Sequence, residues 1–248
     1  MKDFPDYFYT RKWPVFHEDN HLLVLYKPSG LLTQGDRTDD ISLPELAKQW
    51  IKVRYQKPGR VFLAPVHRLD RPVAGVTVFA RTSKAASRLA AQFRGGTVEK
   101  KYLAVVEGLV PYSSGRLSDD MERRGPTSVI VDLPTEKSRQ AVLFYRVIDT
   151  RKDRSFLEID LVTGRHHQIR AQLANMGFPV LGDLRYGASR PMAERQLALF
   201  AKQICFDHPT GRHRMCFASP LPSGWPWPET GNDPGAPPWN YRDLVDVL

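Results

Sequence analysis

Residues 67–75, His-Arg-Leu-Asp-Arg-Pro-Val-Ala-Gly, carry the side chains best suited to do chemistry. One carboxylate, Asp70, stands between two guanidiniums, Arg68 and Arg71. Neighbouring positive charge favours the ionised form of a carboxyl group, so we expect Asp70 to be ionised at neutral pH. An ionised carboxylate suits a nucleophile or general base better than a general acid. A structural ion pair at a loop would contain the same residues, and this stretch alone does not separate the two interpretations.

The chain around Asp70 predicts a stiff loop that leads into a strand. Pro72 fixes its own φ and pushes Arg71 toward an extended conformation. Gly75 allows a sharp turn, and the apolar residues 76–80 that follow predict a buried strand. A rigid loop at the start of a strand would hold the carboxylate in one place.

The stretch from His67 to Gly75 resembles the H-R-L-D-x-x-x-x-G motif of the RluA-type pseudouridine synthases, whose aspartate is the catalytic nucleophile. Further motifs of that family follow the same order along the chain. Residues 18–32 resemble the first motif, a strand running into K-P-x-G; residues 100–108 resemble K-x-Y-x-A-x-V-x-G; residues 164–173 resemble G-R-x-H-Q-I-R-x-x-L; and residues 179–183 resemble P-x-x-G-D. Together they span residues 18–183, about two thirds of the chain. One mild departure is His166, where the family more often has threonine.

The resemblance implies an enzyme that isomerises uridine in RNA to pseudouridine. Asp70 would attack the uridine, either at the ribose or at the pyrimidine ring. Tyr102 would stack on the target base, and Arg170 would pair with Asp70. A guanidinium on a helix can bind a carboxylate bidentately and fix its rotamer.

Five further residues are expected at the substrate, namely Lys27, His67, Arg68, Arg165 and Leu173. Arg68 could fill the place of a flipped-out uridine or hold the adjacent phosphate, since a guanidinium can do both. Lys27, with the proline after it, is expected to support the catalytic loop. Leu173 could line the pocket, but its helical spacing from Ile169 favours a packed core position.

The charge of the chain agrees with an RNA partner. Its formal net charge is +9, and the basic residues recur along the whole chain rather than in one tail. Such an excess predicts a polyanionic partner, although a merely basic soluble protein would look the same. The family implies ribosomal or transfer RNA. No apolar run approaches the roughly 20 residues of a membrane span, so we expect a cytoplasmic protein, by default a monomer.

No cofactor and no metal ion are expected. The chain has no phosphate-binding glycine loop and no cysteine–histidine spacing typical of zinc. Cys205 and Cys216 are too few for a disulfide scaffold and are expected to pack as small hydrophobic residues. His166 and His167 are adjacent, and on a helix their side chains would point in different directions.

Apolar periodicity predicts the elements that position these residues. Helices are expected at 42–54 and 82–93, and a third after Thr163 that ends at Gly177. Strands are expected at 22–26, 76–80, 97–108, 140–148, 155–161, 203–206 and 214–218. Residues 109–137 are expected to be loop-rich, and residues 192–200 to form a short helix.

The expected organisation is an N-terminal leader (1–14), a catalytic domain (15–219) and a Pro- and Trp-rich tail (220–248) packed on that domain. The resemblance implies an α+β fold with a long, mixed, mainly antiparallel sheet in two lobes, flanked by helices, with a central catalytic cleft. Many family members carry an S4-like domain before the first motif. Here that motif begins near residue 18, so we expect no such domain.

Two alternatives come from other functional classes. A catalytically silent RNA-binding or chaperone protein could keep the same fold, and activity on total RNA would separate it from an enzyme. A carboxylate-based glycosidase usually needs two acids that flank the scissile bond. No second carboxylate accompanies Asp70 in these motifs.

Overall fold

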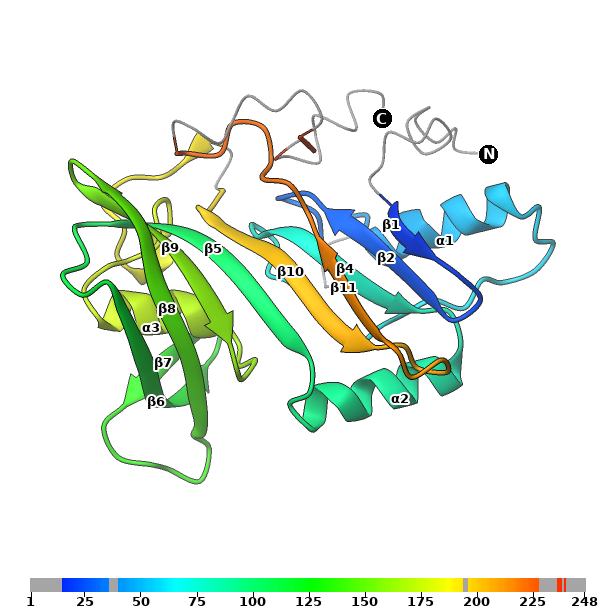
Figure 1. The fold of residues 1–248 in the computed structure, drawn as a ribbon, viewed down its shortest axis with the longest axis horizontal. Coiled ribbons are helices and arrows are strands. Elements are labelled where there is room, and N and C mark those ends of the chain that lie inside the picture. The colour runs from blue at the N-terminus through cyan, green and yellow to red at the C-terminus, as the bar shows by residue number, and fades with distance from the viewer. Residues whose placement is uncertain (1–14, 36–39, 194–195, 228–235, 238, 240–248) are drawn as a thin grey trace. The chain divides into compact units, whose positions relative to one another are not determined.

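A computed structural model describes residues 15–35, 40–193, 196–227, 236–237 and 239 (Figure 1). The chain divides into two compact units. Of the described residues, the first unit contains 15–35, 40–98, 203–225, 236–237 and 239, and the second contains 99–193, 196–202 and 226–227. The expected leader lies outside the described residues, and the expected domain boundaries stay a prediction.

The first unit is built on strands β2 and β4. Its strands are β1 (Val15–Glu18), β2 (Leu22–Lys27), β3 (Ala64–Pro65), β4 (Ala74–Ala80), the end of β10 (Leu199–Asp207) and β11 (Arg214–Ala218). The pairs β1–β2, β2–β4, β3–β4 and β10–β11 are all antiparallel. Every residue of β2 and β4 is buried. A strand buried on both faces reads as a continuous apolar run, which is why the sequence predicted both.

Helices α1 (Leu43–Arg54) and α2 (Ser83–Arg94) cover opposite faces of these strands. Successive side chains of a strand alternate between the two faces. Leu23 of β2 accordingly lies in a cluster with Leu46 of α1, whereas Leu22 lies in a cluster with Leu89 of α2. Both helices begin where predicted, after the capping residues Ser42 and Thr82.

The second unit is an antiparallel sheet with one helix packed against it. Its order is β5 (Glu99–Glu107), β9 (Arg154–Leu161), β8 (Arg139–Arg151), β6 (Ser114–Arg124) and β7 (Thr127–Val131). Helix α3 (Gln168–Asn175) packs through Ala171 against Met121 and Ala141. A short 3₁₀ helix, η2 (Leu184–Tyr186), follows.

Two of the expected elements were wrong. Residues 109–137 contain the β6–β7 hairpin, whose turn is made by Gly125 with a φ of 60°. Strand β6 is rich in charged residues, and all but one of its residues are exposed or half-exposed, so it lacks the apolar alternation that marks a strand. The short helix expected at 192–200 is wrong at Leu199 and Phe200, because they begin β10.

Cys205 and Cys216 are joined by a disulfide, which corrects the expectation that they pack separately. They are direct partners across the antiparallel pair β10–β11, a proximity that their separation along the chain does not reveal. His166 and His167 do not point apart either. Both precede α3, their rings stack with centroids 3.8 Å apart, and His167 has a φ of 53°.

Three tryptophans of the C-terminal segment, Trp225, Trp227 and Trp239, are buried. The rings of Trp225 and Trp239 stack in the first unit with centroids 5.1 Å apart. Trp227 stacks on Phe156 in the second unit, and its indole N–H donates to Asp149. Within the described ranges, no helix combines the length and apolar composition needed to cross a bilayer.

Candidate active site

A buried lysine organises the loop that carries Asp70. The Lys27 ammonium donates to the backbone carbonyls of Pro28, Leu31 and Arg71 at 3.0, 2.8 and 3.1 Å, and the side chain is fully buried. Burial lowers the pKa of Lys27, and the negative charge of Asp70 offsets only part of this effect. The resulting pKa is about 7. The ammonium and the Asp70 carboxylate therefore attract each other, in addition to the contacts that Lys27 makes with the loop backbone.

Further hydrogen bonds fix the loop on both sides of Asp70. The Thr33 hydroxyl donates to the carbonyl of Leu69 at 2.8 Å and accepts from its N–H at 3.2 Å. The Ser29 hydroxyl donates to the carbonyl of Pro72 at 2.8 Å. The turn after β2 therefore fixes the backbone of the Asp70 loop on both sides of the carboxylate.

His67 and Arg68 differ in their surroundings. His67 Nε2 accepts a hydrogen bond from the backbone N–H of Val78 at 3.0 Å, and its ring stacks on Phe93. These contacts anchor the start of the loop to β4 and α2. Arg68 is exposed and Asp70 is partly exposed, so both can be reached from solvent. The expected contacts of His67 and Arg68 with substrate stay predictions.

In the second unit, Arg170 is held by a carboxylate that the sequence did not single out for this task. Its Nε and one terminal nitrogen donate to the two oxygens of Asp183 at 2.6 and 2.8 Å. Both side chains are buried, and the guanidinium also lies over the ring of Tyr186 at 5.0 Å. A bidentate pair between planar groups fixes the orientation of the arginine. The P-x-x-G-D motif pointed to Asp183 without revealing its partner.

Gln168 was also missed, and it shapes the turn before α3. Its side-chain oxygen accepts from the Thr163 hydroxyl at 2.7 Å and from the backbone N–H of Arg165 at 3.0 Å. Its amide nitrogen donates to the carbonyl of Val142 at 3.1 Å. The Arg165 guanidinium donates through Nε to the carbonyl of Gln140 at 2.9 Å and is otherwise exposed. The turn is thereby fixed while Arg165 stays accessible.

Tyr102 and Leu173 have different environments. Tyr102 lies on β5 opposite Ile159 and is half-buried, so part of it can be reached. Leu173 is fully buried on α3, which favours the core position that its spacing allowed.

The expected site residues thus fall into two groups. The first unit carries Lys27, His67, Arg68 and Asp70, and the second carries Tyr102, Arg165, Arg170 and Leu173.

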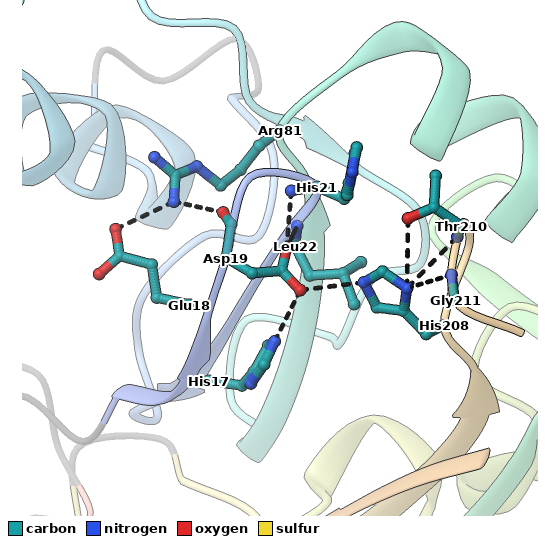
Figure 2. Close-up of polar contacts among 9 residues, drawn as sticks. All are labelled: His17, Glu18, Asp19, His21, Leu22, Arg81, His208, Thr210 and Gly211. Atoms are coloured by element: carbon teal, nitrogen blue, oxygen red, sulfur yellow. Dashed lines mark hydrogen bonds and ion pairs between the residues drawn. The ribbon is translucent and has the colours of Figure 1, made fainter. Parts of the chain in front are cut away.

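A second polar cluster surrounds Asp19 at the end of β2 opposite Lys27 (Figure 2). One carboxylate oxygen of Asp19 accepts from the backbone N–H groups of His21 and Leu22, and the other lies 2.9 Å from Nε2 of both His17 and His208. His208 Nδ1 accepts from a backbone N–H of the β10–β11 turn, so its Nε2 carries the proton given to Asp19. We interpret the cluster as a structural clamp between two hairpins. Among the described residues, no group of three or more ligands could hold a metal ion.

Asp19→Ala is expected to destabilise the protein at neutral pH but less so in acid. Burial alone would raise the pKa of Asp19, but the hydrogen bonds from His17, two backbone N–H groups and His208 outweigh it and lower the pKa below the ordinary carboxyl value. Stability from a lowered carboxyl pKa is present above about pH 4 and is lost as the pH falls. Urea unfolding should show a loss of roughly 1–2 kcal/mol at pH 6, allowing for solvent screening. The difference from wild type should narrow by pH 3, and an unchanged difference would contradict this assignment.

Residues 21–175 match the RNA pseudouridylate synthase family. The chain is 31% identical to ribosomal large subunit pseudouridine synthase D of Pseudomonas aeruginosa, over 86% of this chain and 69% of that protein. It is 33% identical to the uncharacterized RNA pseudouridine synthase YhcT of Bacillus subtilis, over 84% of this chain and 68% of that protein. Among solved structures it resembles human RNA pseudouridylate synthase domain containing 4, with a TM-score of 0.72 and 24% identity over 86% of this chain and 89% of that chain.

The chain therefore belongs to the RNA pseudouridylate synthase family. It is an RNA pseudouridine synthase, an isomerase that acts on uridine in RNA. The likeness to the human structure confirms the expected fold class, α+β with a mainly antiparallel sheet. The expected catalytic cleft stays a prediction.

Proposed function

We propose that Asp70 is the nucleophile of the isomerisation. The observation that supports this best is the way its loop is held: the carboxylate is partly exposed, while Lys27 and two hydroxyl groups fix the backbone on either side. A nucleophile gains most when its position is set before the substrate arrives. A structural ion pair would not need a buried lysine with three carbonyl partners.

In the proposed reaction Asp70 attacks the target uridine at the ribose or at the ring, and the glycosidic bond from N1 to C1′ breaks. The detached base turns, its C5 bonds to C1′, and Asp70 is released. The proton on C5 is lost and N1 gains one, so no cofactor is consumed. Tyr102 stacks on the base, and Arg170, oriented by Asp183, holds Asp70.

The target uridine must leave any base-paired stack before it can react, because its reacting atoms are inaccessible inside a helix. We propose that Arg68 takes the vacated place or holds the adjacent phosphate, which its exposure allows. Lys27 and His67 are proposed to support the loop, and Arg165 to contact the RNA. Leu173 is proposed to pack beneath the site.

We propose large-subunit ribosomal RNA as the substrate, ahead of transfer RNA. Relatives from Pseudomonas aeruginosa and Buchnera aphidicola bear the names ribosomal large subunit pseudouridine synthase D and C. The net charge of +9 suits either polyanion. The proposal includes a monomer that acts in the cytoplasm.

The test is to incubate the purified protein with unmodified transcripts of large-subunit ribosomal RNA and of transfer RNA, and then to map pseudouridine at nucleotide resolution. New pseudouridine at one or a few uridines of the ribosomal transcript is expected. Modification of transfer RNA alone would overturn the choice of substrate. RNA binding without modification of either transcript would favour the catalytically silent protein.

A further inference from the structure

Two neighbouring lysines at the start of β5 have opposite surroundings. Lys101 forms ion pairs with Glu158 at 3.3 Å and with Asp160 at 3.0 Å, both on β9. Lys100 is one residue earlier and therefore faces the other side of the sheet. Tyr102, two residues beyond Lys100, shares that side. The tyrosine proposed to stack on the target base thus has a lysine beside it on the same face.

The Lys100 ammonium lies against the turn before α3. It would be 3.7 Å from a Cβ placed on Gly164. Burial lowers the pKa of Lys100, and the positive charge of Arg165, the residue after Gly164, lowers it further. The resulting pKa is about 8. Within the described ranges, Lys100 has neither a hydrogen-bond partner nor a carboxylate partner. The fold therefore holds two cations near each other without a neutralising group.

The turn that presents Arg165 is rigid. Gln168 binds the Arg165 backbone N–H, and Gln140 binds the guanidinium Nε, so the cation cannot move freely away from Lys100. Holding like charges together while one of them is partly buried costs free energy. A bound anion would remove that cost. Lys101, by contrast, has two carboxylates that neutralise its charge.

We propose that Lys100 and Arg165 form a subsite for one backbone phosphate of the RNA, next to the nucleotide that stacks on Tyr102. This rests on the proposed role of Tyr102 as the base platform. Two cations suit a phosphodiester, whose single negative charge is shared by two exposed oxygens. The subsite would set the register of the strand, so that the target base reaches the tyrosine.

The test compares Lys100→Gln with Lys101→Gln, which change the net charge equally. Binding of a 12-nucleotide oligouridylate is measured in the Asp70→Asn background, so that no turnover is needed. Lys100→Gln should weaken binding roughly ten-fold or more, as expected for one charge-assisted contact. It should also reduce the salt slope of log Kd against log[salt] by about 0.7, the value for one phosphate of a single strand. Lys101→Gln should change the affinity by less than about two-fold.

A double variant adds a local readout. If Lys100 and Arg165 hold the same phosphate, the combined loss in Lys100→Gln/Arg165→Gln should be smaller than the product of the single losses. Lys100→Arg should restore most of the affinity. Equal losses in the two lysine variants, multiplicative losses in the double variant, or no binding by the parent protein would each overturn the subsite.

The subsite and the proposed function can fail separately. In the active protein, Lys100→Gln should raise KM with little change in kcat on the ribosomal transcript, since a phosphate contact is made before and during reaction. A fall in kcat with an unchanged KM would show that Lys100 only supports the folded structure and does not contact a phosphate, which would overturn the subsite. If Asp70 proves not to be the nucleophile, the binding comparison still decides whether the phosphate subsite exists.

Discussion

Asp70→Asn should abolish pseudouridine formation, with a loss of roughly 10⁴-fold or more in kcat, the scale seen when a nucleophile is removed. The amide keeps the shape of the side chain but has no negative charge with which to attack. The measurement is release of tritium from C5 of uridine in labelled ribosomal transcript. The bound fraction of RNA should stay close to that of the wild type, because Lys27, Ser29 and Thr33 hold the loop backbone and remain in place in this variant.

A matched control contacts the same loop from the segment before α1. Asp40 forms an exposed ion pair with Arg71, with nitrogen and oxygen 2.8 Å apart. Exposed pairs contribute little to stability, so Asp40→Asn should keep activity within about two-fold. If Asp70→Asn and Asp40→Asn lost activity to the same extent, the effect would belong to the charge of the loop and not to a nucleophile.

Asp183→Ala should be the most destabilising single change at the candidate site. It would leave the Arg170 guanidinium buried without the carboxylate that binds two of its N–H groups. Removing one partner of a buried ion pair costs ~3–5 kcal/mol, because the remaining charge stays desolvated. Urea unfolding should show this loss, and activity should fall in protein that is still folded, because Arg170 loses its orientation.

Asp160→Ala provides the comparison for an exposed pair. Asp160 contacts Lys101 at 3.0 Å with a side chain that is 60% exposed, so its removal should cost less than ~1 kcal/mol. Asp183→Asn tests whether the charge or the shape matters, since it keeps a hydrogen-bond acceptor but loses the bidentate ion pair. A similar small loss for Asp183→Ala and Asp160→Ala would show that Arg170 is not held as described.

The sequence predicted the parts of the site that depend on local rules. Pro72 and Gly75 predicted a turn at the start of β4. The continuous apolar runs predicted the buried strands β2 and β4. A helix was expected from residue 42, and in the structure Ser42 caps α1 in a capping box with Glu45. Each of these signals is contained in a few consecutive residues, so it can be recognised without knowing how distant segments pack.

What the sequence could not predict depends on contacts between segments. Asp183 reaches Arg170 from a loop beyond α3, and no spacing rule links the two. The Gln168 side chain binds the backbone N–H of Arg165 across a turn in which His167 has a positive φ. The sequence did not predict that turn. The β6–β7 hairpin escaped because charged residues replace the apolar alternation of an ordinary strand. In each case tertiary packing, and not local propensity, determines the outcome.

The burial of Lys27 also has a consequence for measuring motion. Its amine is enclosed, with three backbone oxygens around it, so an acylating reagent can reach it only when this part of the first unit opens. The rate at which Lys27 is acylated, compared with that of an exposed lysine such as Lys57, would therefore report how often the Asp70 loop separates from the turn after β2.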